Sequence, residues 1–259
     1  MILICPKCKT ELTQIDNSLR CENNHSFDIS RDGYVNLLMS QKSGDKIGDS
    51  RASAHARHSF LSKGYYECLK RAIGERMSGT VLDICCGEGY YDTYGGELFG
   101  FDISKEMVRL AKKSNKSGNY FVANLSHIPI KSESIDTAVH LFAPFNESEF
   151  FRVLKSGGTL YSVIPGENHL WEMKECLYDK PYKNDEKPPK TEKLTLVSKT
   201  KITDTVNIGE DDLKELFSMT PYFYRTSEEN KKRLDGVGDT ALTVDFVILE
   251  YKKQYYYND

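Results

Sequence analysis

Four residues near the start of the chain predict a metal site. Cys5 and Cys8 are separated by two residues and Cys21 and His25 by three, with twelve residues between the two pairs. Thiolate sulfur and imidazole nitrogen are preferred ligands of Zn²⁺, and two closely spaced pairs can complete a tetrahedron. Because four protein ligands leave no position for water, the spacing favours a structural zinc ion over a catalytic one. The alternative is a set of free cysteines buried as small apolar side chains.

A second candidate site begins at the sequence LDICCGEGYYD, residues 82–92. Its apolar start predicts a buried strand, and Gly87 and Gly89 predict a tight turn followed by the start of a helix. Glycines let the backbone approach a ligand, and a helix N-terminus favours a carboxylate or a phosphate. Asp102 follows Asp83 by nineteen residues, at the end of the next apolar run, where a carboxylate can accept both ribose hydroxyls. The pattern indicates a nucleotide-type cofactor; a packing turn without a ligand is the alternative.

Cys85 and Cys86 stand at the centre of this loop. Two cysteines joined by one peptide bond are poorly placed to bind the same metal ion, and no other cysteine or histidine lies near them in sequence. We therefore interpret them as part of the cofactor loop, with Cys86 lining the cofactor pocket and Cys85 filling a tight core position. A cysteine does not adopt positive φ freely, so a glycine in place of Cys85 is expected to relieve the turn.

The elements that position these residues alternate between strands and helices. Short apolar runs predict strands at 80–84, 98–103, 120–123, 135–142 and 159–164. Helices are expected at 105–113 and 148–154. This order predicts an α/β fold with a mostly parallel sheet, in which ligands bind at the carboxyl ends of the strands. A loop rich in proline and lysine at 179–193, a helix at 213–219 and a closing strand at 243–251 complete the expected pattern.

Length and composition indicate one main domain with a small appendage. The chain has 259 residues, of which 39% are hydrophobic and 28% charged, enough for a full core. We expect a zinc-binding module over 1–38, a linker and helical segment over 39–75, and a cofactor domain over 76–259. No apolar run approaches the roughly 18 residues that cross a membrane, and the N-terminal run is too short for a secretory signal. A cytoplasmic protein without a membrane partner is therefore expected.

Residues 76–165 resemble the class I methyltransferases, which use S-adenosylmethionine. The resemblance rests on Asp83 before the loop, Asn124 after the third strand, and the segment RVLKSGG at 152–158. It implies a Rossmann-like fold and S-adenosylmethionine as the cofactor. Where that family usually has the first of three alternating glycines, this chain has Cys85.

The whole chain closely resembles the RlmA family of 23S rRNA guanine-N1 methyltransferases. The similarity extends over ordered blocks: CPKC, CENNHSFDISRDGYVNLL, GDSRASAHARHSFLSKGYY, LDICCGEGYY, FAPF, PGENHLWEMKE and MTPYFYR. It implies a structural zinc ion bound by Cys5, Cys8, Cys21 and His25. It also implies cofactor contacts from Tyr66, Cys86, Gly87 and His169, to which the wider fold adds Asp102 and Asn124. Without the resemblance, Tyr66 could equally be a packing residue of a helix, and His169 could be a structural residue that caps the next helix.

The reaction implied by the resemblance is methyl transfer to N1 of a guanine in a hairpin loop of 23S rRNA. That nitrogen carries a proton, and the candidate acceptors are His140 on the fourth strand, Glu88 and Asp92 in the loop, or water. Phe142 and Phe145, in the block FAPF, lie where enzymes of this fold hold a base, and either ring could stack on it.

The partner implied by the resemblance is 23S rRNA. The net charge of −3 gives no overall attraction to a polyanion, so RNA must contact local basic segments. Such segments occur at 42–71, where seven Lys and Arg residues accompany three acids, and at 180–193. Whether the protein forms a homodimer is left open. Two other functions also remain: a small-molecule methyltransferase, which has no evident need for the zinc site, and a non-catalytic rRNA-binding protein with a degenerate cofactor loop.

Overall fold

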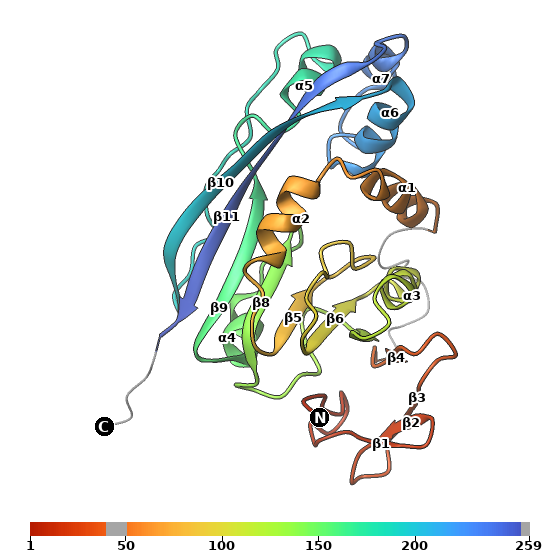
Figure 1. The fold of residues 1–259 in the computed structure, drawn as a ribbon, viewed down its shortest axis with the longest axis vertical. Helices are drawn as coiled ribbons and strands as arrows, with labels where there is room; N and C mark the ends of the chain where they lie inside the picture. Colours follow the sequence, from red (N-terminus) through yellow and green to blue (C-terminus); the bar gives the residue numbers. More distant parts are fainter. Residues whose placement is uncertain (40–50, 255–259) are drawn as a thin grey trace.

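The computed structural model describes residues 1–39 and 51–254, with the backbone alone for 51–55. Its main body is an eight-stranded sheet in the order β10-β11-β9-β8-β5-β6-β7-β4 (Figure 1). The strands from β9 to β4 pair in parallel, whereas β11 is antiparallel to both neighbours. The bounds are β4 Val35–Asn36, β5 Val81–Ile84, β6 Leu98–Asp102, β7 Asn119–Val122, β8 Ile135–Leu141, β9 Leu154–Pro165, β10 Leu194–Ile208 and β11 Thr240–Lys253. The mostly parallel α/β sheet expected from the sequence is confirmed.

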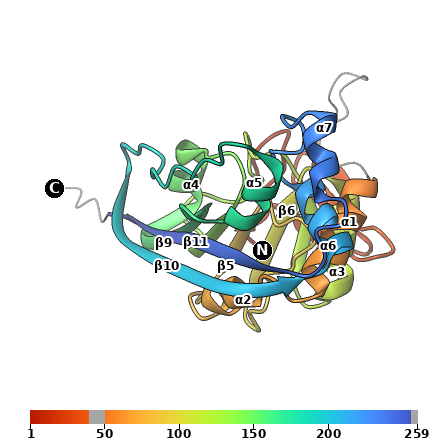
Figure 2. The same ribbon diagram turned by 90° about the horizontal axis from the view of Figure 1, so that it is seen from above.

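Helices cover both faces of this sheet. Figure 2 shows α2 on one face and α4 and α5 on the other. The helices are α1 Arg51–Ser62, α2 Glu67–Gly74, α3 Lys105–Ser114, α4 Glu147–Val153, α5 Trp171–Leu177, α6 Glu210–Met219 and α7 Glu228–Lys231, with a 3-10 turn at Lys232–Leu234. Within the described ranges, no helix is long and apolar enough to cross a membrane.

Successive side chains of β5 point to opposite faces of the sheet, and each face has its own apolar core. Val81 packs in a cluster with Leu69 of α2, whereas Leu82 and Ile84 pack in a second cluster with Phe150 of α4. All five of these side chains are fully buried. Because strand side chains alternate between faces, Asp83 lies on the same face as Val81, toward α2. This alternation places a carboxylate inside an otherwise apolar layer.

The crossover from β5 to β6 differs from the expectation. A helix was expected to start after the glycine turn, but residues 85–97 contain turns and no helix. Three of these residues have left-handed φ: Cys85 (57°), Gly87 (55°) and Gly89 (70°). A right-handed helix cannot run through such positions, and thirteen residues leave little length for one after the turn. The expected helix N-terminus is therefore absent from this site.

The short crossover leaves a cavity of about 280 Å³ on the α2 face of the sheet. Its lining comes from α1, α2 and the turn between them, the crossover itself and the C-terminal end of α3. Parallel neighbouring strands are usually joined through a helix, so the cavity marks the volume that such a helix would fill. The acidic side chains that line it are Glu67, Glu88 and Asp92.

The N-terminal segment is joined to the main sheet. A three-stranded antiparallel sheet contains β1 Thr13–Ile15, β2 Ser18–Arg20 and β3 Ser26–Asp28. Before it, Leu3 bridges Ile130, and the Ile4 N–H donates to the Pro129 carbonyl over 3.0 Å. After it, β4 pairs with β7 at the edge of the large sheet. The apolar core therefore continues from this segment into the main domain.

Candidate metal and cofactor sites

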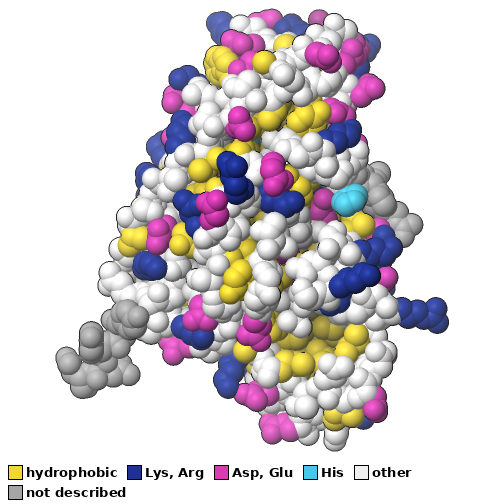
Figure 3. Space-filling model, in the orientation of Figure 1, with side chains coloured by type: hydrophobic (Ala, Val, Ile, Leu, Met, Phe, Trp, Pro, Cys, Tyr) yellow, Lys and Arg dark blue, Asp and Glu magenta, His cyan; other side chains and the backbone are white. Residues whose placement is uncertain are grey.

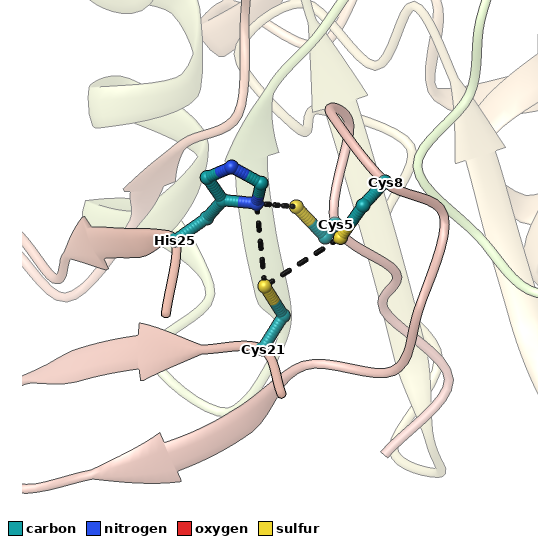
Figure 4. Close-up of side chains that lie close together, drawn as sticks. All are labelled: Cys5, Cys8, Cys21 and His25. Carbon is teal, nitrogen blue, oxygen red and sulfur yellow. Dashed lines mark hydrogen bonds between the residues drawn. The ribbon is translucent and has the colours of Figure 1, made fainter. Parts of the chain in front are cut away.

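The four predicted metal ligands converge in the structure. The His25 Nδ1 atom lies 3.5 Å from the Cys5 Sγ and 3.4 Å from the Cys21 Sγ, and the Cys8 and Cys21 Sγ atoms are 3.6 Å apart (Figure 4). All four ligand atoms lie within 4.8 Å of one another. A tetrahedron with zinc–sulfur bonds near 2.3 Å has edges of roughly 3.8 Å, so the geometry fits one Zn²⁺.

Local turns give this site its shape and charge. The Cys5 carbonyl accepts from the Lys9 N–H over 2.8 Å, in a turn closed by the left-handed φ of Lys9 (65°). Hydrogen bonds from the side chains of Asn23 and Thr10 lower the pKa of Cys8 to about 5. Zinc binds the thiolate form of cysteine, which such hydrogen bonds favour. The donor set therefore fits zinc in chemistry as well as in distance.

Asp102 is joined directly to the glycine loop. Its Oδ2 accepts from the Gly87 N–H over 3.1 Å, and its Oδ1 accepts from the Ser104 N–H over 2.8 Å. The Cys86 N–H donates to the Phe101 carbonyl over 2.9 Å, which closes the loop over the end of β6. The structure thus brings together the acid and the loop that the sequence paired by spacing. This arrangement suits a ribose held at the carboxyl edge of the sheet.

Neither loop cysteine carries a reactive thiol. Cys85 adopts a left-handed φ of 57°, the conformation that favours glycine. Burial raises the pKa of the Cys85 thiol to about 12, and burial also raises the pKa of the Cys86 thiol. Both therefore stay protonated near neutral pH, which is unfavourable for metal binding and for nucleophilic chemistry.

Two buried acids lie beside the loop. Asp83 and Asp92 are 1% and 8% exposed. Both oxygens of Asp83 and the Oδ1 of Asp92 lack a hydrogen-bond partner in the described part of the chain. A buried carboxylate without a partner is costly, so this site fits a ligand that brings positive charge and N–H donors. S-adenosylmethionine carries both a sulfonium and an ammonium group, and the residues present therefore fit this cofactor.

Tyr66 and His169 are in contact although they lie 103 positions apart in the sequence. Tyr66 precedes α2, and its hydroxyl lies 3.4 Å from the His169 Nε2. The His169 Nδ1 accepts from the Asp245 N–H over 3.1 Å, so the ring proton is on Nε2. Burial lowers the pKa of His169 to about 3, which keeps the ring neutral. Both side chains pack against Phe246, at ring-centroid distances of 5.0 and 4.7 Å.

Comparisons with known proteins agree with both sites. Residues 3–46 match the model of the RlmA N-terminal zinc ribbon, and residues 81–158 match that of a methyltransferase domain. The chain is 29% identical to the 23S rRNA (guanine(748)-N(1))-methyltransferase of Streptomyces fradiae over 95% of both chains. It is 30% identical to a candidate 23S rRNA (guanine-N1)-methyltransferase of Micromonospora griseorubida, over 68% of this chain and 69% of that one.

The chain belongs to the RlmA family of 23S rRNA (guanine-N1)-methyltransferases. A candidate member from Bacillus subtilis is 28% identical over 95% of both chains. The predicted family, the class I fold with its zinc module, and the pair of cofactors are confirmed. The roles of individual residues stay predictions.

RlmA-family chemistry needs an acceptor for the guanine N1 proton, and the structure places the three candidate side chains. The His140 Nε2 lies 3.1 Å from the Pro144 carbonyl and so donates to it, and its Nδ1 lies 3.0 Å from the Ser162 hydroxyl. Burial lowers the pKa of His140 to about 4. The ring nitrogens are thus both engaged, one with the turn after β8 and the other with β9. Glu88 and Asp92 line the cavity on the α2 face.

Phe142 and Phe145 differ in their surroundings. Phe145 packs edge-on against His140 and Phe150, at centroid distances of 5.8 and 5.1 Å. Phe142 is 48% exposed and adopts a left-handed φ of 53° at the end of β8. Backbone strain of this kind is concentrated at functional sites. Of the two rings, Phe142 is therefore the one free to contact a base.

Several predicted RNA-contacting lysines are neutralised by acids. Lys63 pairs with Asp212 and Glu215, and Lys70 pairs with Glu67. Lys42 and Lys46 fall outside the described residues. Figure 3 shows Lys and Arg side chains gathered over α3, an element whose basic character the sequence analysis did not use. The basic residues of α3 are Lys105, Arg109, Lys112 and Lys113, of which Arg109 pairs with Glu106 of the same helix.

Proposed function

We propose that this chain transfers the methyl group of S-adenosylmethionine to N1 of a guanine in a hairpin loop of 23S rRNA. The observation that carries the proposal is that the zinc ribbon and the sheet that bears the cofactor site share one continuous apolar core. The chain also aligns with an rRNA methyltransferase over 95% of its length. A small-molecule methyltransferase would not require that first module.

The cofactor supplies a methyl group already activated on a sulfonium, so the chain acts mainly by positioning. In this proposal Asp102 accepts the ribose hydroxyls while the Gly87 N–H holds its carboxylate in place. In the same proposal Tyr66 and His169 contact the cofactor, and Asn124, which follows β7, contacts it as well. Holding donor and acceptor in line can contribute up to roughly 7 to 11 kcal/mol to lowering the barrier.

Phe142 is the proposed support for the target base. It lies at the carboxyl end of β8, and its ring is backed by Phe246 at 5.8 Å between centroids. Phe246 in turn contacts His169 and Tyr66, so the proposed base platform and the proposed cofactor contacts share one aromatic cluster. A base stacked on Phe142 would therefore be positioned by the same residues that hold the cofactor.

Water is the favoured acceptor of the N1 proton. His140 has both nitrogens engaged, and Glu88 is held by the His58 Nδ1, 2.9 Å from its Oε1. Asp92 accepts from the Tyr120 hydroxyl over 2.6 Å. The Oε2 of Glu88 and the Oδ1 of Asp92 lack a partner among the described residues, but both carboxyl groups are buried, whereas the half-exposed Phe142 ring is open to solvent.

A primer-extension assay tests the function directly. Methylation at N1 removes a Watson–Crick donor, so reverse transcriptase is expected to stop one nucleotide before a single loop guanine of protein-free 23S rRNA. Phe142→Ala should weaken this stop, while Tyr182→Ala, at a similarly exposed ring away from the platform, should preserve it. Label transferred only to small metabolites would favour a small-molecule enzyme. Binding of rRNA without binding of cofactor would indicate a non-catalytic protein.

RNA binding, location and assembly complete the proposal. We infer that the basic face of α3 contacts the rRNA backbone and that the protein acts in the cytoplasm, where ribosomes assemble. Because phosphate contacts release counterions, affinity for rRNA should fall steeply as salt rises. Analytical ultracentrifugation tests whether the chain forms a homodimer.

A further inference from the structure

The carboxyl groups of Asp83 and Asp92 form a buried pair that the proposed chemistry does not use as a base. Asp83 extends from β5 toward the α2 face, and Asp92 follows the glycine turn. Both are more than nine-tenths buried, and the Tyr120 hydroxyl donates to the Asp92 Oδ2 over 2.6 Å. Three of the four carboxyl oxygens have no partner among the described residues.

Two adjacent carboxylates cannot both stay ionised in a dry environment without a cation. Among the residues that the structure describes, the titratable groups that interact with the pair are Tyr120, Asp102, Cys85, Cys86 and Tyr91, and none of these is positively charged. Burial and the neighbouring Asp92 raise the pKa of Asp83 well above its usual value, and burial also raises the pKa of Asp92. The Tyr120 hydrogen bond favours the ionised form of Asp92, which leaves Asp83 as the protonated member.

We propose that Asp83 and Asp92 share one proton in the free protein and release it when the ammonium group of the cofactor's methionine moiety binds beside them. This inference rests on the proposed function for the identity of the ligand. The proton leaves the Asp83 carboxyl for solvent, and N–H donors of the ammonium group take up the unpartnered oxygens. Asp92 is thus a positioning residue, which acts through Asp83 and makes cofactor binding depend on pH.

The cavity left by the missing crossover helix gives the released proton a route to solvent. Asp92 and Glu88 both line it, and Glu88 is joined to His58, whose side chain is 44% exposed. The cavity therefore extends from Asp92, a member of the buried pair, to the partly exposed His58. A helix packed over the crossover would have closed this route.

Titration calorimetry on the full chain tests the proposal, using S-adenosylhomocysteine and 5′-methylthioadenosine as probes. The second probe keeps the nucleoside but lacks the amino-acid moiety. Measured at pH 6 to 7 in two buffers of different ionisation enthalpy, S-adenosylhomocysteine should release about one proton and methylthioadenosine none. A binding step that releases one proton tightens as pH rises, by up to about tenfold per pH unit, and levels off above the pKa of Asp83.

Two variants separate the roles within the pair. Asp92→Asn keeps the size of the side chain but removes its charge, so proton release should fall and the pH dependence should flatten. Tyr120→Phe removes the hydroxyl and leaves both carboxyl groups, so proton release should persist. Neither change should alter the affinity for methylthioadenosine by more than about twofold, because that probe carries no ammonium group.

The wild-type protein alone can overturn the proposal. Binding of S-adenosylhomocysteine without proton exchange would refute it, as would equal proton release with methylthioadenosine. Proton-coupled binding in a protein that never methylates rRNA would leave this inference standing and overturn the proposed function. A protein that binds no S-adenosylhomocysteine would overturn both.

Discussion

The metal site and the cofactor site differ in how complete they are. In the metal site the four ligand atoms face one another at 3.4 to 3.6 Å along the contacts described, and the surrounding turns close on themselves. In the cofactor site, by contrast, Asp83 is fully buried with neither oxygen paired. The first arrangement is typical of a permanent structural ion. The second is typical of a site that is completed only when its ligand binds.

Of the changes that test this comparison, loss of zinc should have the largest effect on stability. Cys8→Ser is expected to abolish zinc binding and to destabilise the whole chain by about 3 to 5 kcal/mol, because zinc binding contributes directly to folding. The loss should extend beyond the ribbon, since Leu3 bridges Ile130 and β4 pairs with β7. Elemental analysis and differential scanning calorimetry measure the two quantities.

A cysteine outside the metal site provides the control. Cys176→Ser, on α5, should keep one zinc per chain and nearly the wild-type melting temperature. If Cys8→Ser retained zinc, or lost it with no thermal shift, the site would not be structural.

The second largest effect should be on cofactor affinity, when the acid bound to the glycine loop is replaced. Asp102→Ala is expected to weaken S-adenosylhomocysteine binding by about 1.5 to 3 kcal/mol, the usual effect of losing hydrogen bonds to a charged group. The same change also frees the Gly87 N–H that the carboxylate holds. Calorimetry measures it, with Asp185→Ala in the exposed 178–193 loop as the control. Unchanged affinity would mean that the ribose lies elsewhere.

Sequence patterns predicted the metal site more completely than the cofactor site for a physical reason. The ligands of the metal site lie within 21 residues, and their spacing alone restricts the geometry. The cofactor site depends on contacts between residues that are far apart in sequence, such as Tyr66 and His169. No local sequence pattern predicts such contacts. Only the resemblance to a family suggested that pair.

The largest errors in the fold prediction concern the crossover and β10. The glycine turn is typical of the start of a strand–turn–helix unit. The residues of the turn do not determine whether a helix follows them, so the missing helix was not predicted. The strand β10 was missed because it is an edge strand whose side chains are mostly polar and partly exposed. Its stability comes from pairing with β11 from Leu194 to Ile208, a partner that follows much later in the sequence.

The base platform should show a smaller effect that separates activity from stability. Phe142→Ala is expected to reduce kcat/KM on rRNA by an amount equivalent to about 1 to 3 kcal/mol, the range for stacking on an aromatic ring. Its melting temperature should change little, because the ring is half exposed. Phe145→Ala should instead lower the melting temperature, since that ring packs against His140 and Phe150. Equal thermal losses in both variants would contradict the assignment.

The smallest expected effect is at Cys85. Its φ of 57° lies in the left-handed region, which costs a residue with a side chain about 1 to 2 kcal/mol. Cys85→Gly removes that strain but adds flexibility to the unfolded chain, so the net gain in stability should be at most about 1 kcal/mol. Cofactor affinity should be equal or slightly higher.

Cys86→Gly is the matched control. The φ of Cys86 is not left-handed and its side chain is buried, so the same substitution one residue later should lower stability. Thermal melts of the two variants compare them directly, and a destabilised Cys85→Gly would show that the thiol contributes more by packing than its backbone loses by strain.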